Sequence, residues 1–205
     1  MALYRDKVFP RIMNATLDTP ETRAARARVC AGLTGEVVEI GFGSGLNLPW
    51  LPAAVSRLHA VDPSTAGARL AAGRIRDSSV PVAPAGLDGE ALLLRDGSVD
   101  SALSTWTLCT VPDPVQALRE IRRVLRPGGR LHFLEHGAAP DEGVRRWQDR
   151  LNRVQKRVAC GCNLNRDIPR LIESAGLRLE RIDTYYTPRE PRLVGWTYEG
   201  VATVS

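Results

Sequence analysis

The chain has 205 residues and a formal net charge of +5 at pH 7, with 43% hydrophobic and 25% charged residues. These totals are typical of one sizeable, soluble globular domain. The sequence shows no repeats, and no apolar run approaches the roughly 20 residues that a membrane-spanning helix needs. Because residues 1–13 carry charges where a signal peptide would need an apolar block, we expect a cytoplasmic protein.

The cysteines do not follow the spacing of a known disulfide or zinc motif. They are Cys30, Cys109, Cys160 and Cys162, and none of them forms a Cys-x-x-Cys pair. Cys160 and Cys162 are too close together for an easy disulfide, and the paired spacings of a zinc site are absent. We therefore expect free thiols in a reducing compartment and no metal site.

Helical and strand patterns alternate along most of the chain. Residues 1–31 read as helical, with Thr19 as one helix start. A helix over 113–125 has Asp113 as its cap and is expected to end at Gly128. The other predicted elements are strands over 35–41 and 56–62, a helix over 63–77, strands over 80–85, 98–106 and 129–136, helices over 141–158 and 167–175, and strands over 177–186 and 192–204.

This order of elements predicts the fold class. Alternation of strand and helix as far as residue 136 is typical of parallel strands with helices on both faces of the sheet. The last two strands are joined by residues 187–191, a segment too short for a helical crossover, so we expect an antiparallel hairpin there. The sequence therefore predicts an α/β fold with a doubly wound, mostly parallel sheet and one antiparallel strand in a C-terminal hairpin.

A glycine turn follows the first buried strand, with Gly41, Gly43 and Gly45 in alternate positions. Glycine adopts backbone angles that other residues avoid and lets another molecule approach the main chain. The spacing differs from the dinucleotide pattern Gly-x-Gly-x-x-Gly, because position 46 is Leu46. Asp62 ends the next strand about twenty residues on, where its carboxylate can accept hydrogen bonds from both hydroxyls of a ribose. A nucleoside-binding turn is our hypothesis, and an ordinary tight turn is the alternative.

The loop before the fourth strand adds two further candidates. The Asp88 carboxylate could accept a hydrogen bond from an adenine amino group, and the backbone amide of Gly89 could donate to the ring. Four segments of the chain can be compared with known families: "VVEIGFGSG", "AVDPS", "DGEALLLRDGSVDSALS" and "ALREIRRVLRPGGRLHFLEH". With these segments, the chain over residues 35–136 resembles the class I S-adenosylmethionine-dependent methyltransferases, with a methyltransferase type 11 domain.

The resemblance implies a Rossmann-like sheet, S-adenosyl-L-methionine as cofactor and S-adenosyl-L-homocysteine as product. It also implies that the glycine turn lies against the cofactor and that Asp62 holds the ribose. Asp88 and Gly89 would hold the adenine, and Glu39 would support the turn or the cofactor's amino group. The candidate cofactor-binding residues are Glu39, Gly41, Phe42, Gly43, Gly45, Asn47, Asp62, Pro63, Asp88, Gly89 and Thr105.

The C-terminal half contains four further segments, "TWTLCTVPDP", "FLEHGAAP", "RWQDRL" and "GCNLNRD". They narrow the resemblance to a subgroup of small methyltransferases, which includes animal thiol methyltransferases and uncharacterised bacterial relatives. The implied function is methyl transfer to a small-molecule nucleophile, with a thiol as the first hypothesis. The alternatives are a methyltransferase for lipid head groups or quinone precursors, and a non-catalytic cofactor-binding module.

Ligands of open α/β sheets bind beyond the carboxyl ends of the strands, so residues at those ends are candidates for the acceptor side. His136 ends the fifth strand, where it could act as a general base or could instead form a structural hydrogen bond. We expect Cys109, near the end of the fourth strand, to serve in packing. The candidate acceptor-side residues are Trp106, Glu135, Trp147, Asn163 and Arg166.

The helix over 144–158 is amphipathic, with basic residues off its apolar stripe. The stripe consists of Val144, Trp147, Leu151, Val154 and Val158. We expect this stripe to pack under a solvated face, and weak contact with a membrane surface or a gating role is the alternative.

We expect one domain over residues 1–205, with a small molecule as acceptor. Its parts are a helical lid over 1–31, a cofactor-binding core over 35–136, and substrate-side helices with the hairpin over 137–205. We expect no nucleic-acid partner, because the chain has no run of aromatic and basic residues for base stacking. The sequence leaves the oligomeric state open.

Overall fold

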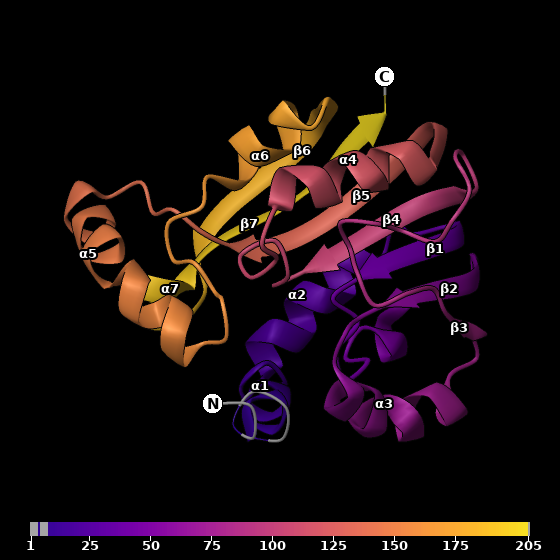
Figure 1. Cartoon of the computed structure of the whole chain (residues 1–205), viewed down its shortest axis with the longest axis horizontal. Helices are drawn as coiled ribbons and strands as arrows, with labels where there is room; N and C mark the ends of the chain where they lie inside the picture. Colours follow the sequence, from indigo (N-terminus) through magenta and orange to yellow (C-terminus); the bar gives the residue numbers. More distant parts are fainter. Residues whose placement is uncertain (1–3, 5–7, 205) are drawn as a thin grey trace.

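A seven-stranded sheet runs through the molecule, with helices on both faces (Figure 1). The computed structural model describes residues 4 and 8–204. The strands, in chain order, are β1 (Gly35–Ile40), β2 (Val55–Val61), β3 (Val82–Pro84), β4 (Val99–Thr105), β5 (Leu125–His136), β6 (Leu177–Tyr186) and β7 (Trp196–Val204). The helices are α1 (Phe9–Thr16), α2 (Pro20–Cys30), η2 (Leu48–Trp50), α3 (Thr65–Asp77), α4 (Pro114–Val124), α5 (Glu142–Val158), α6 (Ile168–Ser174) and α7 (Arg192–Gly195).

The sheet has the strand order β3-β2-β1-β4-β5-β7-β6, which confirms the predicted fold class. Strands β1 to β5 pair in parallel, whereas β7 pairs antiparallel with both β5 and β6. The C-terminal hairpin is therefore present, and its second strand lies inside the sheet. This strand begins at Trp196, later than predicted, because the helical turn α7 takes up residues 192–195. Pro191 precedes that turn and lacks the amide that a strand ladder needs.

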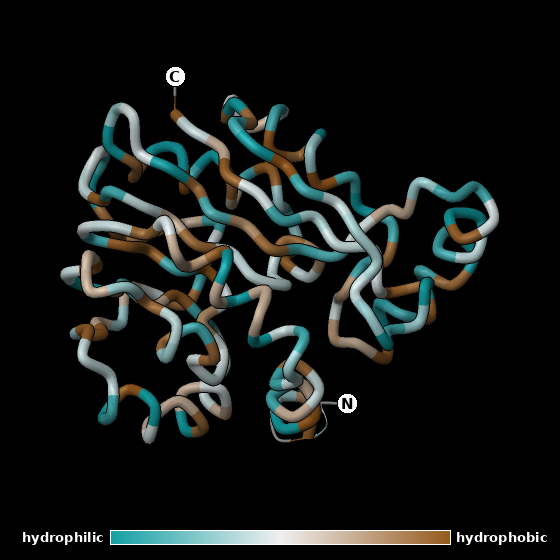
Figure 2. The backbone as a smooth tube through the Cα atoms, turned by 180° about the vertical axis from the view of Figure 1, so that it is seen from behind, coloured by the Kyte–Doolittle hydropathy of each residue, from teal (hydrophilic) through white to brown (hydrophobic). Residues whose placement is uncertain are grey.

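Apolar residues on both faces of the central strands build the core. In β1, the side chains of Val37, Val38 and Ile40 are almost completely inaccessible to solvent. A near-continuous apolar run of this kind is typical of a parallel strand that is covered on both faces. One core layer packs under α4 and α6, and the other packs under α2 and α3. Figure 2 shows hydrophobic residues along the central strands.

One predicted helix boundary is wrong. The helix capped by Asp113 ends at Val124, not at Gly128, and β5 begins directly at Leu125. Pro127 explains the early end, because a residue that precedes proline disfavours the helical conformation. The predicted helix start at Thr19 is confirmed, because Thr19 is extended and caps α2, which separates this helix from α1.

The predicted packing of the α5 apolar stripe is also wrong. Trp147, Val154 and Val158 are 56%, 57% and 53% exposed, and only Gln148 of this helix is buried. The Gln148 side chain hydrogen-bonds the Ala139 amide and the Gly137 and Leu193 carbonyls, so the helix is attached through polar contacts. Figure 1 shows α5 at one end of the molecule, away from most of the sheet. Within residues 8–204, no helix combines the length and apolarity that crossing a membrane requires.

Candidate active site

The glycine turn lies at the carboxyl end of β1 and leaves open space beside its main chain. Gly41, Gly43 and Gly45 all have positive φ angles, of 72°, 54° and 74°. A Cβ atom on Gly41 would lie 1.8 Å from the Thr107 hydroxyl oxygen, so Gly41 is required by packing. A Cβ atom on Gly43 would meet nothing closer than the Gly41 carbonyl oxygen, at 3.8 Å. Gly43 is therefore the position where another molecule can approach the backbone.

Helix α3 packs directly against this turn. Its N-cap is Ser64, whose hydroxyl accepts a hydrogen bond from the Gly67 amide at 3.0 Å. A Cβ atom on Gly67 would lie 2.9 Å from the Gly43 carbonyl oxygen, so only glycine fits between helix and turn. Phe42, predicted to bind the cofactor, is a core residue that is 7% exposed.

Asp62 is fixed beside the turn by two backbone amides. Its Oδ2 accepts a hydrogen bond from the Gly43 amide at 2.8 Å, and its Oδ1 accepts one from the Ser64 amide at 2.7 Å. Burial raises the pKa of Asp62, and the two amides oppose this shift. The carboxylate therefore has a defined position at the end of β2 and remains half-buried.

The predicted adenine loop lies next to Asp62. The Asp62 amide donates to the Gly86 carbonyl, which holds this loop against the end of β2. Gly89 lies over Ile40, because a Cβ atom on Gly89 would come within 3.6 Å of that side chain. The Asp88 carboxylate is exposed and accepts a hydrogen bond from the Glu90 amide at 2.8 Å, and Pro63 is exposed as well.

A buried polar network lies behind the turn and joins four separate segments. The Arg26 Nη1 donates to Asn47 Oδ1 at 2.6 Å and to the Thr105 hydroxyl at 3.2 Å. The Asn47 Nδ2 in turn donates to Glu39 Oε1 at 2.8 Å and to the same hydroxyl at 3.0 Å. Arg26 and Glu39 are 4% and 1% exposed. Helix α2 thus supplies a guanidinium group to the carboxyl ends of β1 and β4.

Two atoms of this network have no hydrogen-bond partner among the described residues: Arg26 Nε and Glu39 Oε2. Burial raises the pKa of Glu39 to about 8, although Asn47 and Arg26 oppose the shift. Burial likewise lowers the pKa of Arg26 to about 10, and the Glu39 carboxylate opposes that shift. Leaving a buried donor and a buried acceptor unpaired costs free energy. A ligand whose anionic group accepts from Arg26 Nε and whose cationic group donates to Glu39 Oε2 would remove this cost.

Trp106 separates this network from the next cavity. Its backbone has a φ of 49°, a strained conformation for a bulky residue, and its amide donates to the Leu134 carbonyl at 2.8 Å. The Arg26 guanidinium carbon lies 4.6 Å from the centre of the indole ring, which is a cation–π contact. The indole therefore touches the polar network through Arg26.

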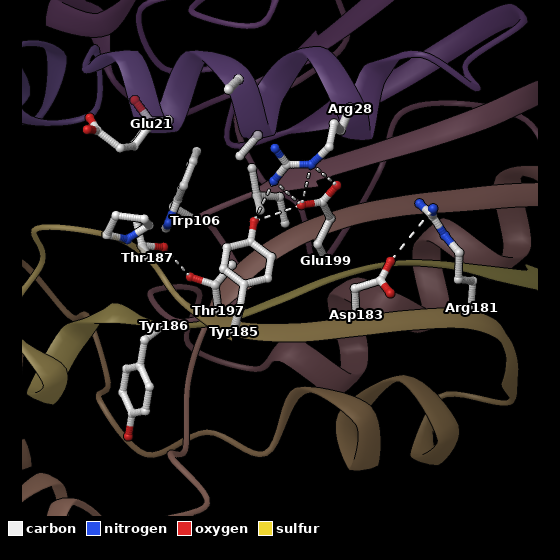
Figure 3. Close-up of a pocket in the computed structure, with 15 residues that line it drawn as sticks. Glu21, Arg28, Trp106, Arg181, Asp183, Tyr185, Tyr186, Thr187, Thr197 and Glu199 are labelled. Atoms are coloured by element: carbon white, nitrogen blue, oxygen red, sulfur yellow. Dashed lines mark hydrogen bonds and ion pairs between the residues drawn. The ribbon is translucent and has the colours of Figure 1, made fainter.

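On the other side of Trp106 lies a cavity of about 640 Å³, between α2 and the strands β5, β7 and β6 (Figure 3). One wall carries an ion pair between Arg28 and Glu199, at 2.7 Å. The Tyr185 hydroxyl donates to the same Glu199 carboxylate at 2.7 Å. Of the acceptor-side residues predicted from the sequence, Trp106 lines this cavity, and the others lie elsewhere.

Three of those other residues support the loop that follows β4. The Glu135 carboxylate is fully buried and accepts hydrogen bonds from the Ser104 hydroxyl at 2.7 Å and the Thr107 amide at 3.0 Å. The Arg166 guanidinium donates to the Leu108 and Val111 carbonyls. The Asn163 side chain donates hydrogen bonds to the Cys109 carbonyl of this loop and to the Gly161 carbonyl of its own loop. Trp147 is exposed on α5, and contact of these residues with the acceptor stays a prediction.

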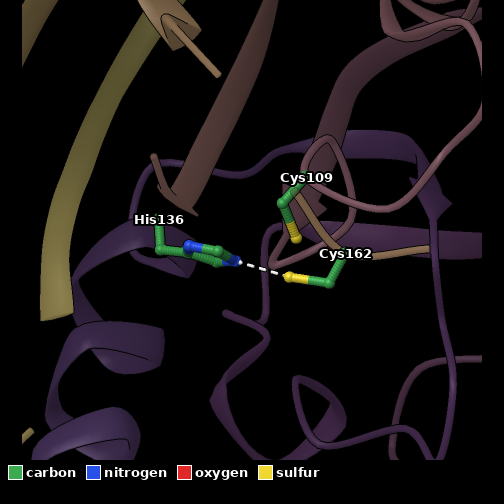
Figure 4. A group of neighbouring side chains, drawn as sticks. All are labelled: Cys109, His136 and Cys162. Carbon is green, nitrogen blue, oxygen red and sulfur yellow. Dashed lines mark hydrogen bonds between the residues drawn. The ribbon is translucent and has the colours of Figure 1, made fainter. Parts of the chain in front are cut away.

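Cys109, His136 and Cys162 form a cluster beyond the ends of β4 and β5 (Figure 4). The His136 Nε2 lies 3.1 Å from the Cys162 sulfur, and one ligand atom from each of the three residues lies within 4.8 Å of the others. The His136 Nδ1 is buried without a hydrogen-bond partner in the described part of the chain. The sequence predicts no metal site, and this stays a prediction; a spacing rule cannot detect side chains that three distant segments bring together.

Comparisons with known proteins point to one family. The family model described as "Methyltransferase domain" matches residues 38–133. Thiol S-methyltransferase TMT1B of Homo sapiens is 34% identical over 157 residues, covering 70% of this chain and 62% of that protein. Thiol S-methyltransferase TMT1A of Homo sapiens is 31% identical over 172 residues, covering 80% of this chain and 69% of that protein. This chain thus spans less than two thirds of the length of the first of these relatives.

A quinone enzyme and a solved structure extend the comparison. The ubiquinone/menaquinone biosynthesis C-methyltransferase UbiE of Acidiphilium cryptum is 34% identical over 102 residues, covering 48% of this chain and 41% of that protein. A geranyl diphosphate methyltransferase in complex with S-adenosylmethionine superposes with a TM-score of 0.69 at 16% identity, covering 94% of this chain and 95% of that chain. This structure shares the fold. The chain belongs to the class I S-adenosylmethionine-dependent methyltransferases.

Proposed function

We propose that the protein transfers a methyl group from S-adenosylmethionine to the thiol of a small molecule. The observation that carries the proposal is the pair of buried, unpartnered atoms beside the glycine turn, Arg26 Nε and Glu39 Oε2. The names of the human relatives support a thiol as the acceptor. When bound, the cofactor supplies an electrophilic methyl group on a positively charged sulfur.

The residues around the turn fit the parts of the cofactor. Glu39 Oε2 can accept from the α-ammonium group, and Arg26 Nε can donate to the α-carboxylate. Asp62 would accept hydrogen bonds from the ribose hydroxyls, while Asp88 and Gly89 would hold the adenine. Asn47 and Thr105 would keep the Arg26 and Glu39 side chains in position through the hydrogen bonds that they already make.

The cavity beside Trp106 is our candidate for the acceptor site. Trp106 is shared by the cavity and by the polar network, so an acceptor held there would lie next to the cofactor site. A thiol needs little further activation, because the thiolate is itself the nucleophile. The chain would position and desolvate the reacting groups. His136 does not line this cavity, and its assignment as general base stays a prediction.

A second candidate acceptor class, quinone precursors or lipid head groups, is supported by different observations. One relative, which aligns with part of this chain, is named a ubiquinone/menaquinone biosynthesis C-methyltransferase. In addition, the apolar stripe of α5 is exposed, next to the basic residues of the same helix. An exposed amphipathic helix with a basic face suits an anionic lipid surface.

A mass-spectrometric screen of thiols, phenols, amines, quinone precursors and phospholipids tests the function. We expect an S-methylated thiol together with an equal amount of S-adenosylhomocysteine. A Trp106→Ala variant should lose more turnover than cofactor affinity, because the indole lines the proposed acceptor cavity. Methylation of a quinone precursor alone would replace the thiol assignment, and cofactor binding with no methylated product would favour a non-catalytic module.

The affinity for the cofactor should rise with pH, because Glu39 must ionise to pair with an ammonium group. Burial holds the pKa of Glu39 at about 8, so the cofactor-free protein keeps this proton at neutral pH. Cofactor binding would release the proton, and the affinity should then increase by up to about tenfold per pH unit between about pH 6 and 7.5. A Glu39→Gln variant should show a flat profile in the same calorimetric titration. Parallel profiles for the two proteins would contradict this pairing.

The N-terminal helical region over 1–31 is expected to act as a lid over the cofactor. The Arg74 Nη1 donates both to Asn14 Oδ1 at 3.1 Å and to the Ser44 carbonyl at 2.9 Å, so one side chain connects α1 with the glycine turn. Hydrogen exchange of the α1 amides should slow when cofactor binds, whereas exchange in α4 should not change. Equal exchange of α1 in the free and bound protein would speak against a lid.

A further inference from the structure

We propose that Cys109, His136 and Cys162 form a binding site for one thiophilic metal ion, with Zn²⁺ as the ion to be tested. The three side chains come from different parts of the fold. Cys109 lies in the loop after β4, His136 is the last residue of β5, and Cys162 lies in the loop between α5 and α6. Two sulfurs and one imidazole nitrogen are the donor types that zinc prefers in proteins.

The geometry of the cluster suits a tetrahedral ion. One donor atom from each residue lies within 4.8 Å of the other two, and the His136 Nε2 lies 3.1 Å from the Cys162 sulfur. Zinc binds sulfur at about 2.3 Å and nitrogen at about 2.0–2.1 Å, which places neighbouring ligand atoms about 3.5–4 Å apart. The side chains thus need only small adjustments to surround one ion. Figure 4 shows the imidazole and the two sulfurs converging on one point.

The backbone around the cluster holds the two cysteines together. The Asn163 amide and its side-chain Nδ2 both donate to the Cys109 carbonyl, at 2.8 Å and 3.0 Å. The same Nδ2 also donates to the Gly161 carbonyl at 3.0 Å. Asn163 therefore connects the loop of Cys109 with the loop of Cys162, and pairing of His136 with Thr197 in β7 fixes the third ligand. A site on such a fixed scaffold loses little conformational freedom when it binds an ion.

A disulfide between the two cysteines is the competing explanation, and the position of His136 argues against it. A disulfide would make no use of an imidazole nitrogen that points at a sulfur, whereas a metal ion uses all three groups. With three protein ligands among the described residues, a tetrahedral ion keeps a fourth position for water or another small ligand. Nε2 would then be bound to the metal, so His136 would serve as a ligand and not as a general base.

Zinc binding by the 205-residue chain tests the proposal without any methyl transfer. The reduced protein is stripped with a chelator and titrated with Zn²⁺ against a competing chromophoric chelator. We expect one ion per chain. Cys162→Ser and Cys109→Ser should each raise the Kd by more than the about 10–100-fold that loss of a supporting residue causes. Cys160→Ser is the matched control, since Cys160 lies two positions from Cys162 and outside the cluster, and it should bind like the parent.

Two further measurements keep the test decisive. Substitution of Co²⁺ should give strong thiolate-to-metal absorption in the parent and in Cys160→Ser, and this absorption should be lost in Cys162→Ser. Cys162 is only half-buried, so this variant is informative even if Cys109→Ser fails to fold. Zinc binding that is unchanged in Cys162→Ser would overturn the proposal. A Cys109–Cys162 disulfide in protein that binds no zinc after reduction would also overturn it, and would identify a redox pair.

Discussion

Replacing Gly43 with valine is expected to abolish binding of S-adenosylmethionine while the sheet remains folded. A Cβ atom at this position would meet only the Gly41 carbonyl oxygen, at 3.8 Å, so the free protein has open space at the point where the side chain begins. That room is where the cofactor would lie against the turn, and a branched side chain would fill it. The positive φ of 54° adds strain of about 1–2 kcal/mol. Calorimetry should detect no binding, and circular dichroism should match the parent.

Helix α3 offers a matched control for this variant. A Cβ atom on Gly73 would meet no other atom within 4 Å, and Gly73 lies inside a helix. Gly73→Ala should therefore leave the cofactor affinity unchanged and raise the free energy of unfolding by up to about 1 kcal/mol. If Gly43→Val bound the cofactor as tightly as the parent, the cofactor would not approach the backbone at this turn.

Removal of the Asp62 carboxylate should have the next largest effect on binding. Asp62→Ala is expected to weaken cofactor binding by about 2–4 kcal/mol, which corresponds to one or two charge-assisted hydrogen bonds to the ribose. The variant should also be less stable, because the Gly43 and Ser64 amides lose their acceptor. Isothermal titration and chemical denaturation measure the two effects separately.

An asparagine at this position separates support of the turn from binding of the ribose. Asp62→Asn keeps one side-chain oxygen that can accept from a backbone amide, but it lacks the negative charge. Its free energy of unfolding should therefore fall by less than its free energy of cofactor binding. Asp77→Ala is the control, because Asp77 is an exposed aspartate at the end of α3. Unchanged affinity in Asp62→Ala would show that the ribose does not contact this carboxylate.

The sequence predicts the features of this protein that depend on local patterns. Alternating strands and helices, and a short final connection, are enough for the sheet and its antiparallel strand. The glycine turn and the position of Asp62 follow in the same way, because strand ends are visible in the sequence. Arg26 could not be predicted, because Arg23 and Arg28 lie in the same helix and its local sequence gives no reason to choose among them.

Contacts between distant segments explain the other differences. The Cys109–His136–Cys162 cluster needs three strand and loop ends to meet, and no spacing in the chain records this. The α5 stripe shows the opposite problem, because amphipathic spacing predicts an apolar face but not what covers it. Here the helix is attached through the Gln148 side chain, and much of the stripe stays exposed. The proposed acceptor cavity lies beside α2 and the last two strands, which local patterns do not place together.

The way in which Asp62 is held has a consequence for steady-state turnover. Two backbone amides orient its carboxylate before any ligand arrives, so binding of a ribose there would gain from this preorganisation. The ribose and the adenine are identical in the cofactor and in its demethylated by-product. Contacts at Asp62 therefore cannot distinguish the two molecules, and S-adenosylhomocysteine should be a competitive inhibitor. Sustained turnover would then depend on removal of this by-product.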